Sequence, residues 1–149
     1  MTERRAGRSQ LPHHRLRAYQ LALDLLTAVR NAQIRDGKLR DQAMRAAKSA
    51  ALNIAEAAGR VSTADRARVF AIARGEAMEA AAAVEIAVVS ADCEPSAFDA
   101  CLPIADELVA VLTGLCRECE CESEYEIEAE AEVRGASPKA SQRWSPQGA

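Results

Sequence analysis

The chain of 149 residues is long enough for one compact domain, and its content of 49% hydrophobic and 28% charged residues is globular rather than disordered. The 33 alanines, with only 3% aromatic residues, 7 glycines and 5 prolines, favour α-helices and exclude an all-β sandwich. The net charge of −3 is unevenly distributed: residues 1–74 carry 15 basic and 6 acidic side chains, whereas residues 75–149 carry 4 and 16.

The first helical pattern begins at Pro12, after a polar, basic stretch, residues 1–11, that we expect to be frayed. Proline is favoured in the first turn of a helix, and Gly37 is placed to end this one. The apolar residues between them share one half of a helical wheel: Leu16, Tyr19, Ala22, Leu23, Leu25, Leu26 and Val29. An amphipathic helix over residues 12–37 is therefore predicted.

A second helix is predicted from Lys38 to Ala58, with Gly59 as its stop. Its apolar stripe is narrow and consists mostly of alanine: Leu39, Ala43, Ala46, Ala50, Ile54 and Ala57. Because these side chains are small, a partner helix can approach closely along this stripe.

A third helix is predicted to start at residues 62–65, where a serine or threonine cap is followed by an aspartate, and to reach as far as Ala91. Between Ala77 and Ala91 only Glu79 and Glu85 are charged, and apolar residues occur on every side. Such a helix needs burial on more than one face. Two explanations are open: self-association through a second face, or an unusually central core helix.

A turn at residues 92–95 precedes a fourth helix, whose apolar residues are Phe98, Leu102, Ala105, Leu108, Val109, Leu112 and Leu115. Pro103 should kink this helix or mark its true start. The four segments predict an all-α domain over residues 12–117. No apolar run reaches the ~18 residues of a membrane span, and no apolar segment follows the N-terminus, so we expect no membrane contact and a cytoplasmic location.

Glutamate occupies every even position from Glu118 to Glu132. Period-two alternation is typical of a strand, yet eight carboxylates on one strand face would repel one another, and glutamate is a poor strand former. The favoured interpretation is a frayed helical extension that runs into a disordered tail, with a strand as the alternative. Residues 118–149 are therefore predicted to form an acidic, largely disordered C-terminal tail.

A line of polar side chains borders the alanine stripe of the second helix: Gln42, Arg45, Ser49, Asn53 and Glu56. Their spacing places them within about 80° on the wheel. Polar groups along a packing edge need partners, and Glu79 on the third helix is a candidate partner for Arg45. Arg45 and Glu56 lie too far apart to pair, so we expect each to find a partner on another element. The line is interpreted as a structural network, and a ligand or nucleic-acid pocket is the alternative.

The stretch from Gln42 to Arg60, QAMRAAKSAALNIAEAAGR, resembles the signature of the four-helix-bundle proteins encoded by intervening sequences within bacterial 23S ribosomal RNA genes. Weaker matches are Tyr19-Gln20 with Ala22, Ile72-Ala73 with Gly75 and Glu79, and Leu112-Thr113-Gly114-Leu115. The resemblance covers about residues 11–117. Three departures affect fine packing: Ala57 replaces a usual glycine, Ala50 a usual isoleucine and Glu76 a usual serine.

The resemblance implies an antiparallel, up-and-down four-helix bundle that assembles into a homopentameric barrel. It also implies kinship with the accessory variability determinant of diversity-generating retroelements, which binds nucleic acid and a reverse transcriptase. An RNA or DNA partner and a reverse-transcriptase partner are therefore expectations that come from the family and not from the residue pattern.

Arginines gather at two places in the basic half of the chain. Arg60, Arg66, Arg68 and Arg74 surround the turn between the second and third helices, and Arg15 and Arg17 follow Arg4, Arg5 and Arg8 near the N-terminus. The guanidinium fork suits phosphate, although a solvated surface face is the alternative interpretation. Aromatic residues that could stack on bases are missing, so any binding should depend on the phosphate backbone and show little sequence preference.

Signatures of catalysis are lacking, and we expect neither an enzyme nor a cofactor. His13 and His14 are the only histidines, and adjacent helical residues diverge by ~100°, so they form no chelate. Three of the five cysteines, Cys116, Cys119 and Cys121, form a C-x-x-C-x-C cluster, which we interpret as reduced thiols rather than a metal site.

The sequence thus predicts a non-enzymatic, oligomeric helical bundle that binds nucleic acid through phosphate contacts, as an accessory to a reverse transcriptase or to ribosomal RNA. A protein-interaction scaffold without nucleic-acid binding is the alternative. The acidic tail could also compete for the basic face, in which case deleting residues 118–149 should tighten nucleic-acid binding.

Overall fold

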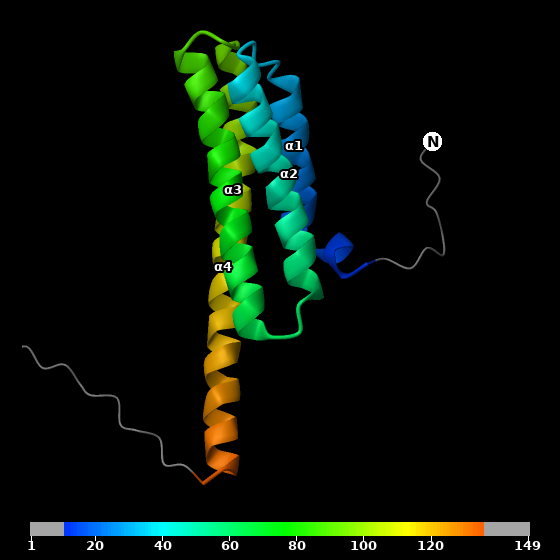
Figure 1. Cartoon of the computed structure of the whole chain (residues 1–149), viewed down its shortest axis with the longest axis vertical. Helices are drawn as coiled ribbons and strands as arrows, with labels where there is room; N and C mark the ends of the chain where they lie inside the picture. Colours follow the sequence, from blue (N-terminus) through cyan, green and yellow to red (C-terminus); the bar gives the residue numbers. More distant parts are fainter. Residues whose placement is uncertain (1–10, 136–149) are drawn as a thin grey trace, which may run out of the picture.

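A computed structural model describes residues 11–135 and shows an all-α fold. A short 3-10 helix, η1 (Pro12–Arg15), precedes four α-helices: α1 (Arg17–Asn31), α2 (Gly37–Gly59), α3 (Thr63–Val89) and α4 (Pro95–Val133). Consecutive helices run in opposite directions and pack as one bundle (Figure 1). Each of α1 and α3 packs against both α2 and α4. The predicted helical bundle is confirmed, whereas the frayed stretch lies, apart from Leu11, outside the described residues.

The prediction of one helix over residues 12–37 is wrong at both ends. Leu16 is extended (φ −83°, ψ 126°) and separates η1 from α1, and α1 ends at Asn31. The chain then turns through Gln33, which has a positive φ of 49°, and buries Ile34 in the core. Gly37 does not stop a helix but begins α2, because the Asp36 side chain accepts a hydrogen bond from the Leu39 amide at 2.7 Å and caps it.

Helices α2 and α3 lie where the sequence pattern predicts them. The expected stripe of α2 is buried from Ala43 to Ala57, with Leu39 half-buried at its start. At the other end of the α2–α3 turn, the Ser62 hydroxyl accepts from the Asp65 amide at 3.3 Å and caps α3. The α2–α3 contact is among the most extensive in the bundle, as expected when small side chains let two helices approach closely.

The core is built mostly from alanine, with few large side chains. Phe70 on α3 is fully buried, and aliphatic residues from the other helices and from the α1–α2 connection complete the centre: Leu25, Ile34, Ile54, Leu108 and Leu112. Because an alanine methyl removes little apolar area from water, these few large residues contribute a large share of the hydrophobic stabilisation.

Helix α4 begins at Pro95, directly after the predicted turn, and it passes through Pro103, so of the two alternatives Pro103 does not mark its start. The favoured helical extension after Arg117 is present. It continues through residues 118–133, further than expected for a largely disordered tail, and projects beyond the α2–α3 turn (Figure 1). Burial of Cys119 against the bundle anchors the first part of this extension. Residues 136–149 lie outside the described part of the chain.

Within residues 11–135, no helix combines the length and the apolar character that crossing a membrane requires.

Candidate functional site

The predicted polar line of α2 makes its main cross-helix contacts near the middle of the bundle. Arg45 Nη2 lies 2.6 Å from Glu79 Oε1 on α3, and Gln42 Nε2 donates to the same oxygen at 3.3 Å. Arg45 Nη1 also lies 3.8 Å from Glu76 Oε2. The expected Arg45–Glu79 pairing is therefore present. Glu76 Oε2 is buried but accepts no hydrogen bond from residues 11–135. This edge of the α2–α3 contact therefore holds a carboxylate oxygen that can still accept one.

The remainder of the line bonds within its own helix. Asn53 Nδ2 donates to the Ser49 carbonyl oxygen at 2.9 Å and to its hydroxyl at 3.1 Å. Glu56 pairs with Arg60, one turn further on, so the expectation that Glu56 needs a partner from another element is wrong. The six network residues thus form three separate local groups and not one continuous chain: Gln42 and Arg45 with Glu79, Ser49 with Asn53, and Glu56 with Arg60.

The α2–α3 turn brings two of the predicted phosphate-binding arginines, Arg60 and Arg68, to the same carboxylate, whereas Arg66 is half-buried and its Nε is buried without a hydrogen-bond partner among residues 11–135. Arg60 contacts Glu56 and lies 3.2 Å from Asp65 Oδ2, and Arg68 Nη2 lies 2.8 Å from Asp65 Oδ1. The hydrogen bond to Glu56, followed by the charges of Asp65 and Glu56, raises the pKa of Arg60. Asp65 was not predicted as a counterion, although its i,i+3 spacing to Arg68 is a signal for such a pair.

The other three predicted arginines are placed differently. Arg74 is half-buried, and its Nε donates to Thr113 Oγ1 on α4 at 2.8 Å, so it faces the α3–α4 contact. Arg17 Nη2 lies 2.7 Å from Glu107 on α4. Arg15 is exposed on η1, which packs against α2. Four arginines therefore form what we call the basic end of the bundle, defined as Arg15, Arg60, Arg66 and Arg68.

The acidic extension, residues 118–133 of α4, passes the same end (Figure 1). Thr63 Oγ1 donates to Glu126 Oε2 at 2.9 Å, which fixes the extension against the first turn of α3. Beyond this contact the side chains are largely exposed, and Tyr125 and Ile127 are 73% and 65% exposed. Glutamates one turn apart repel one another along the extension. Its negative charge therefore lies beside the arginines of the α2–α3 turn.

The outward side of α3 is apolar over most of its length. Exposed residues recur at helical spacing along it: Ala71, Ile72, Gly75, Met78, Ala82, Ile86 and Val89. We call these residues the α3 outer face. Met78 is 49% and Ile86 55% exposed in the single chain. The α3 helix is therefore not buried on all sides within one bundle. Glu85 is also exposed and, seven residues after Met78, lies at the edge of this face, so a carboxylate borders the apolar surface. An exposed apolar face of this kind is typical of a contact surface.

The cysteines occupy separate environments. Cys116 Sγ donates to the Ala67 carbonyl oxygen at 3.7 Å, Cys119 is buried, and Cys121 is exposed. Among residues 11–135 no three His, Cys, Asp or Glu side chains are arranged to hold a metal ion. Burial raises the pKa of Cys93, Cys116 and Cys119, and raises the pKa of Cys101 to about 11.

We expect a thiol reagent at pH 8 to label Cys121 first and Cys101 last. Thiolate is the reactive form, and a pKa of about 11 leaves only about one thousandth of Cys101 ionised at this pH. Mass-spectrometric mapping of alkylated peptides over time measures the order. A Cys121→Ser variant should lose the fast phase, whereas Cys101 should react quickly only after denaturation. Fast labelling of Cys101 in the folded protein would contradict its burial.

The helices and their connections define a small all-α protein of the four-helix-bundle class. Residues 14–114 match the family model of the 23S rRNA-intervening sequence protein, and the chain belongs to this family. The match includes all of α1, α2 and α3 and ends within α4, so the acidic extension lies beyond it. No curated protein matches the chain significantly.

Proposed function

We propose that the protein is a non-enzymatic homo-oligomer that binds RNA or DNA through phosphate contacts at the basic end of the bundle. The observation that carries this proposal is that Arg60, Arg66 and Arg68 lie within or directly after the α2–α3 turn, where Arg60 and Arg68 are exposed around Asp65. A pentamer is the assembly expected from the family resemblance, and a ring of copies would repeat this arrangement and strengthen its electric field.

Self-association is supported by the α3 outer face. Ala71, Gly75 and Ala82 have small or no side chains, which allows another helix to approach closely, while Met78 and Ile86 supply apolar area. The polar pair of Arg45 and Glu79 flanks this face and would form the polar rim that interfaces commonly have. A second copy of the chain is therefore the partner that we assign to the α3 outer face.

Phosphate binding is supported by the exposure of the arginines. The side chains of Arg60 and Arg68 are 42% and 60% exposed, although both contact Asp65. Exposed ion pairs contribute only about 0–1 kcal/mol, so a phosphate can replace the carboxylate partner at little energetic cost. The guanidinium group stays charged at any physiological pH and can donate two parallel hydrogen bonds to a phosphate.

The combined variant Arg60→Gln, Arg66→Gln and Arg68→Gln should weaken binding to labelled RNA or DNA by about tenfold or more at low salt. The slope of log affinity against log salt should fall by about one for each arginine that contacts a phosphate. Fluorescence anisotropy with duplex and single-stranded probes, including 23S rRNA fragments, measures both quantities. The matched control is Arg30→Gln, Lys38→Gln and Lys48→Gln, which changes the net charge equally on exposed parts of α1 and α2.

A second arm of this experiment tests the influence of the acidic extension. Deleting residues 118–149 would remove buried Cys119, so we prefer five glutamate-to-glutamine changes at even positions from Glu124 to Glu132, which preserve the helix. Removing these charges should tighten binding severalfold, because they lie beside the arginines. Unchanged affinity would show that the extension does not compete with nucleic acid.

Absence of binding at low salt, or equal weakening by both triple variants, would reject the basic end as a nucleic-acid site. The protein would then be a protein-interaction scaffold, which is the alternative function. Under the first function, a reverse transcriptase or ribosomal RNA is the proposed setting, and it rests on the family resemblance alone.

A further inference from the structure

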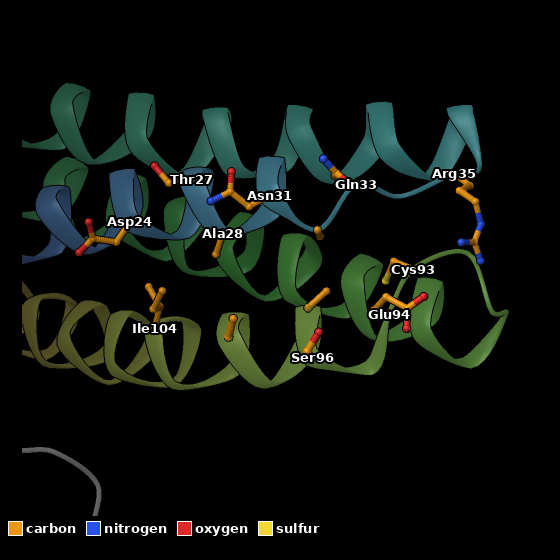
Figure 2. Close-up of a pocket in the computed structure, with 13 residues that line it drawn as sticks. Asp24, Thr27, Ala28, Asn31, Gln33, Arg35, Cys93, Glu94, Ser96 and Ile104 are labelled. Carbon is orange, nitrogen blue, oxygen red and sulfur yellow. The ribbon is translucent and has the colours of Figure 1, made fainter.

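A groove of about 700 Å³ lies between α1 and α4 at the end of the bundle opposite the basic end. Figure 2 shows Asp24 at one end of this groove and Cys93 with Glu94 toward the other. Ala28 and Ile104 extend from the facing helices between these ends (Figure 2). The volume is in the range of small-molecule sites.

The charged groups of the groove favour a cation. Asp24 and Glu94 line it and take part in no ion pair within residues 11–135. Arg35 is the basic residue of the lining, but its guanidinium donates to the Ala91 carbonyl oxygen at the α3–α4 turn. The groove therefore presents two carboxylates without an ion-pair partner and one guanidinium that stays positively charged but is turned to the Ala91 carbonyl oxygen, so the charge of its lining is negative. Nucleotides and other anions are poor candidates for such a site.

The surface between the carboxylates favours an elongated ligand with an aliphatic stem. Ala28, Ala97 and Ala100 contribute methyl groups along the groove, and Ile104 contributes a larger apolar surface. The amide side chains of Asn31 and Gln33 add oxygen acceptors at the rim. Glu94 directly precedes α4 and Ile104 is its tenth residue, which corresponds to about 15 Å along the helix.

We propose that this groove binds a linear aliphatic polyamine of the spermidine or spermine class. The carboxylates of Asp24 and Glu94 accept hydrogen bonds from the two terminal ammonium groups, and the methylene segments lie on the alanine and isoleucine surface. The amide oxygens of Asn31 and Gln33 accept from the internal secondary ammonium groups. Hydrogen bonds between an ammonium group and a carboxylate are about twice as strong as neutral ones, which suits a site that is open to solvent.

Isothermal titration of the full chain with spermidine at low salt tests the proposal. We expect saturable binding with one polyamine per chain, and the variant Asp24→Asn with Glu94→Gln should weaken it by about tenfold or more. Glu94 makes no capping hydrogen bond to α4, so this change leaves the helix start intact. The control is Asp99→Asn with Asp106→Asn, which removes two exposed carboxylates of α4 that do not line the groove.

A third variant tests whether spermidine binds in the groove itself or is only attracted by the negative charge of the surface. Ala100 is exposed and lines the groove, so Ala100→Trp fills the space without changing charge. Loss of spermidine binding in this variant, with unchanged helix content by circular dichroism, supports the groove. The proposal would be overturned if Ala100→Trp bound spermidine as well as the unmodified chain, or if the control pair weakened binding equally. It would also be overturned if Mg²⁺ bound equally tightly, or if no binding were detected at about 1 mM spermidine.

Discussion

Replacing Met78 with glutamate is expected to leave the protein monomeric at micromolar concentration while its helix content stays unchanged. Met78 is 49% exposed at the middle of the α3 outer face, so one bundle tolerates a charge there. In an assembly through this face, the substitution would place a carboxylate from each copy in an apolar contact. Burying an unpaired charge costs several kcal/mol, more than a marginal interface supplies. Light scattering coupled to size-exclusion chromatography measures the mass directly.

The matched control for this substitution is Leu102→Glu. Leu102 lies on α4 and is 48% exposed, so the chemical change and the initial exposure are nearly the same on a different helix. We expect this variant to keep the mass of the unmodified protein. A monomeric unmodified protein, or equal dissociation in both variants, would contradict assembly through the α3 outer face.

Which segments are helical, and which side of each helix faces the core, could be predicted because both depend on local periodicity. The alanine stripe of α2 and the start of α3 at Ser62 follow from spacing and capping residues within a few positions of one another. The apolar residues on every side of α3 between Ala77 and Ala91 left two explanations open, self-association or a central core helix. The exposure of Met78 and Ile86 shows that α3 is not a central core helix within one bundle, whereas self-association stays a proposal.

The errors arose where a nonlocal contact outweighs a local signal. Gly37 is typical of a helix end, but the Asp36 cap and burial of Ile34 make it the first residue of α2 instead. The glutamates after residue 117 disfavour order through repulsion, but burial of Cys119 and the Thr63–Glu126 hydrogen bond anchor a helix.

The candidate sites were predictable only where both partners lie at regular positions on neighbouring helices. The Arg45–Glu79 pair meets this condition, since each residue lies on a helix edge that the periodicity defines. Arg74 does not, because its partner Thr113 belongs to a helix whose rotation the sequence leaves open. The groove combines Asp24 with Glu94, 70 positions later, and its lining includes Gln33 and Arg35 of the α1–α2 connection, which was predicted as helix.

Replacing Phe70 with alanine is expected to lower the free energy of unfolding by about 3–5 kcal/mol. Phe70 is fully buried, and the residues around the bundle axis are mostly alanines on rigid helices. Such a core has few long side chains that could move into the cavity, so the cost should lie near the upper end of that range. Unfolding in urea is best measured in the monomeric Met78→Glu background, because association otherwise adds to the apparent stability.

Phe98→Ala provides the comparison, because Phe98 is the other phenylalanine of the chain and is only half-buried against the core. Its loss removes a similar side chain but leaves a site that water can enter, so we expect a cost of about 1–2 kcal/mol. The difference between the two variants measures the contribution of a single large residue to an alanine-rich core. Equal costs would mean that the helices close around the Phe70 cavity, and that small side chains make this bundle deformable.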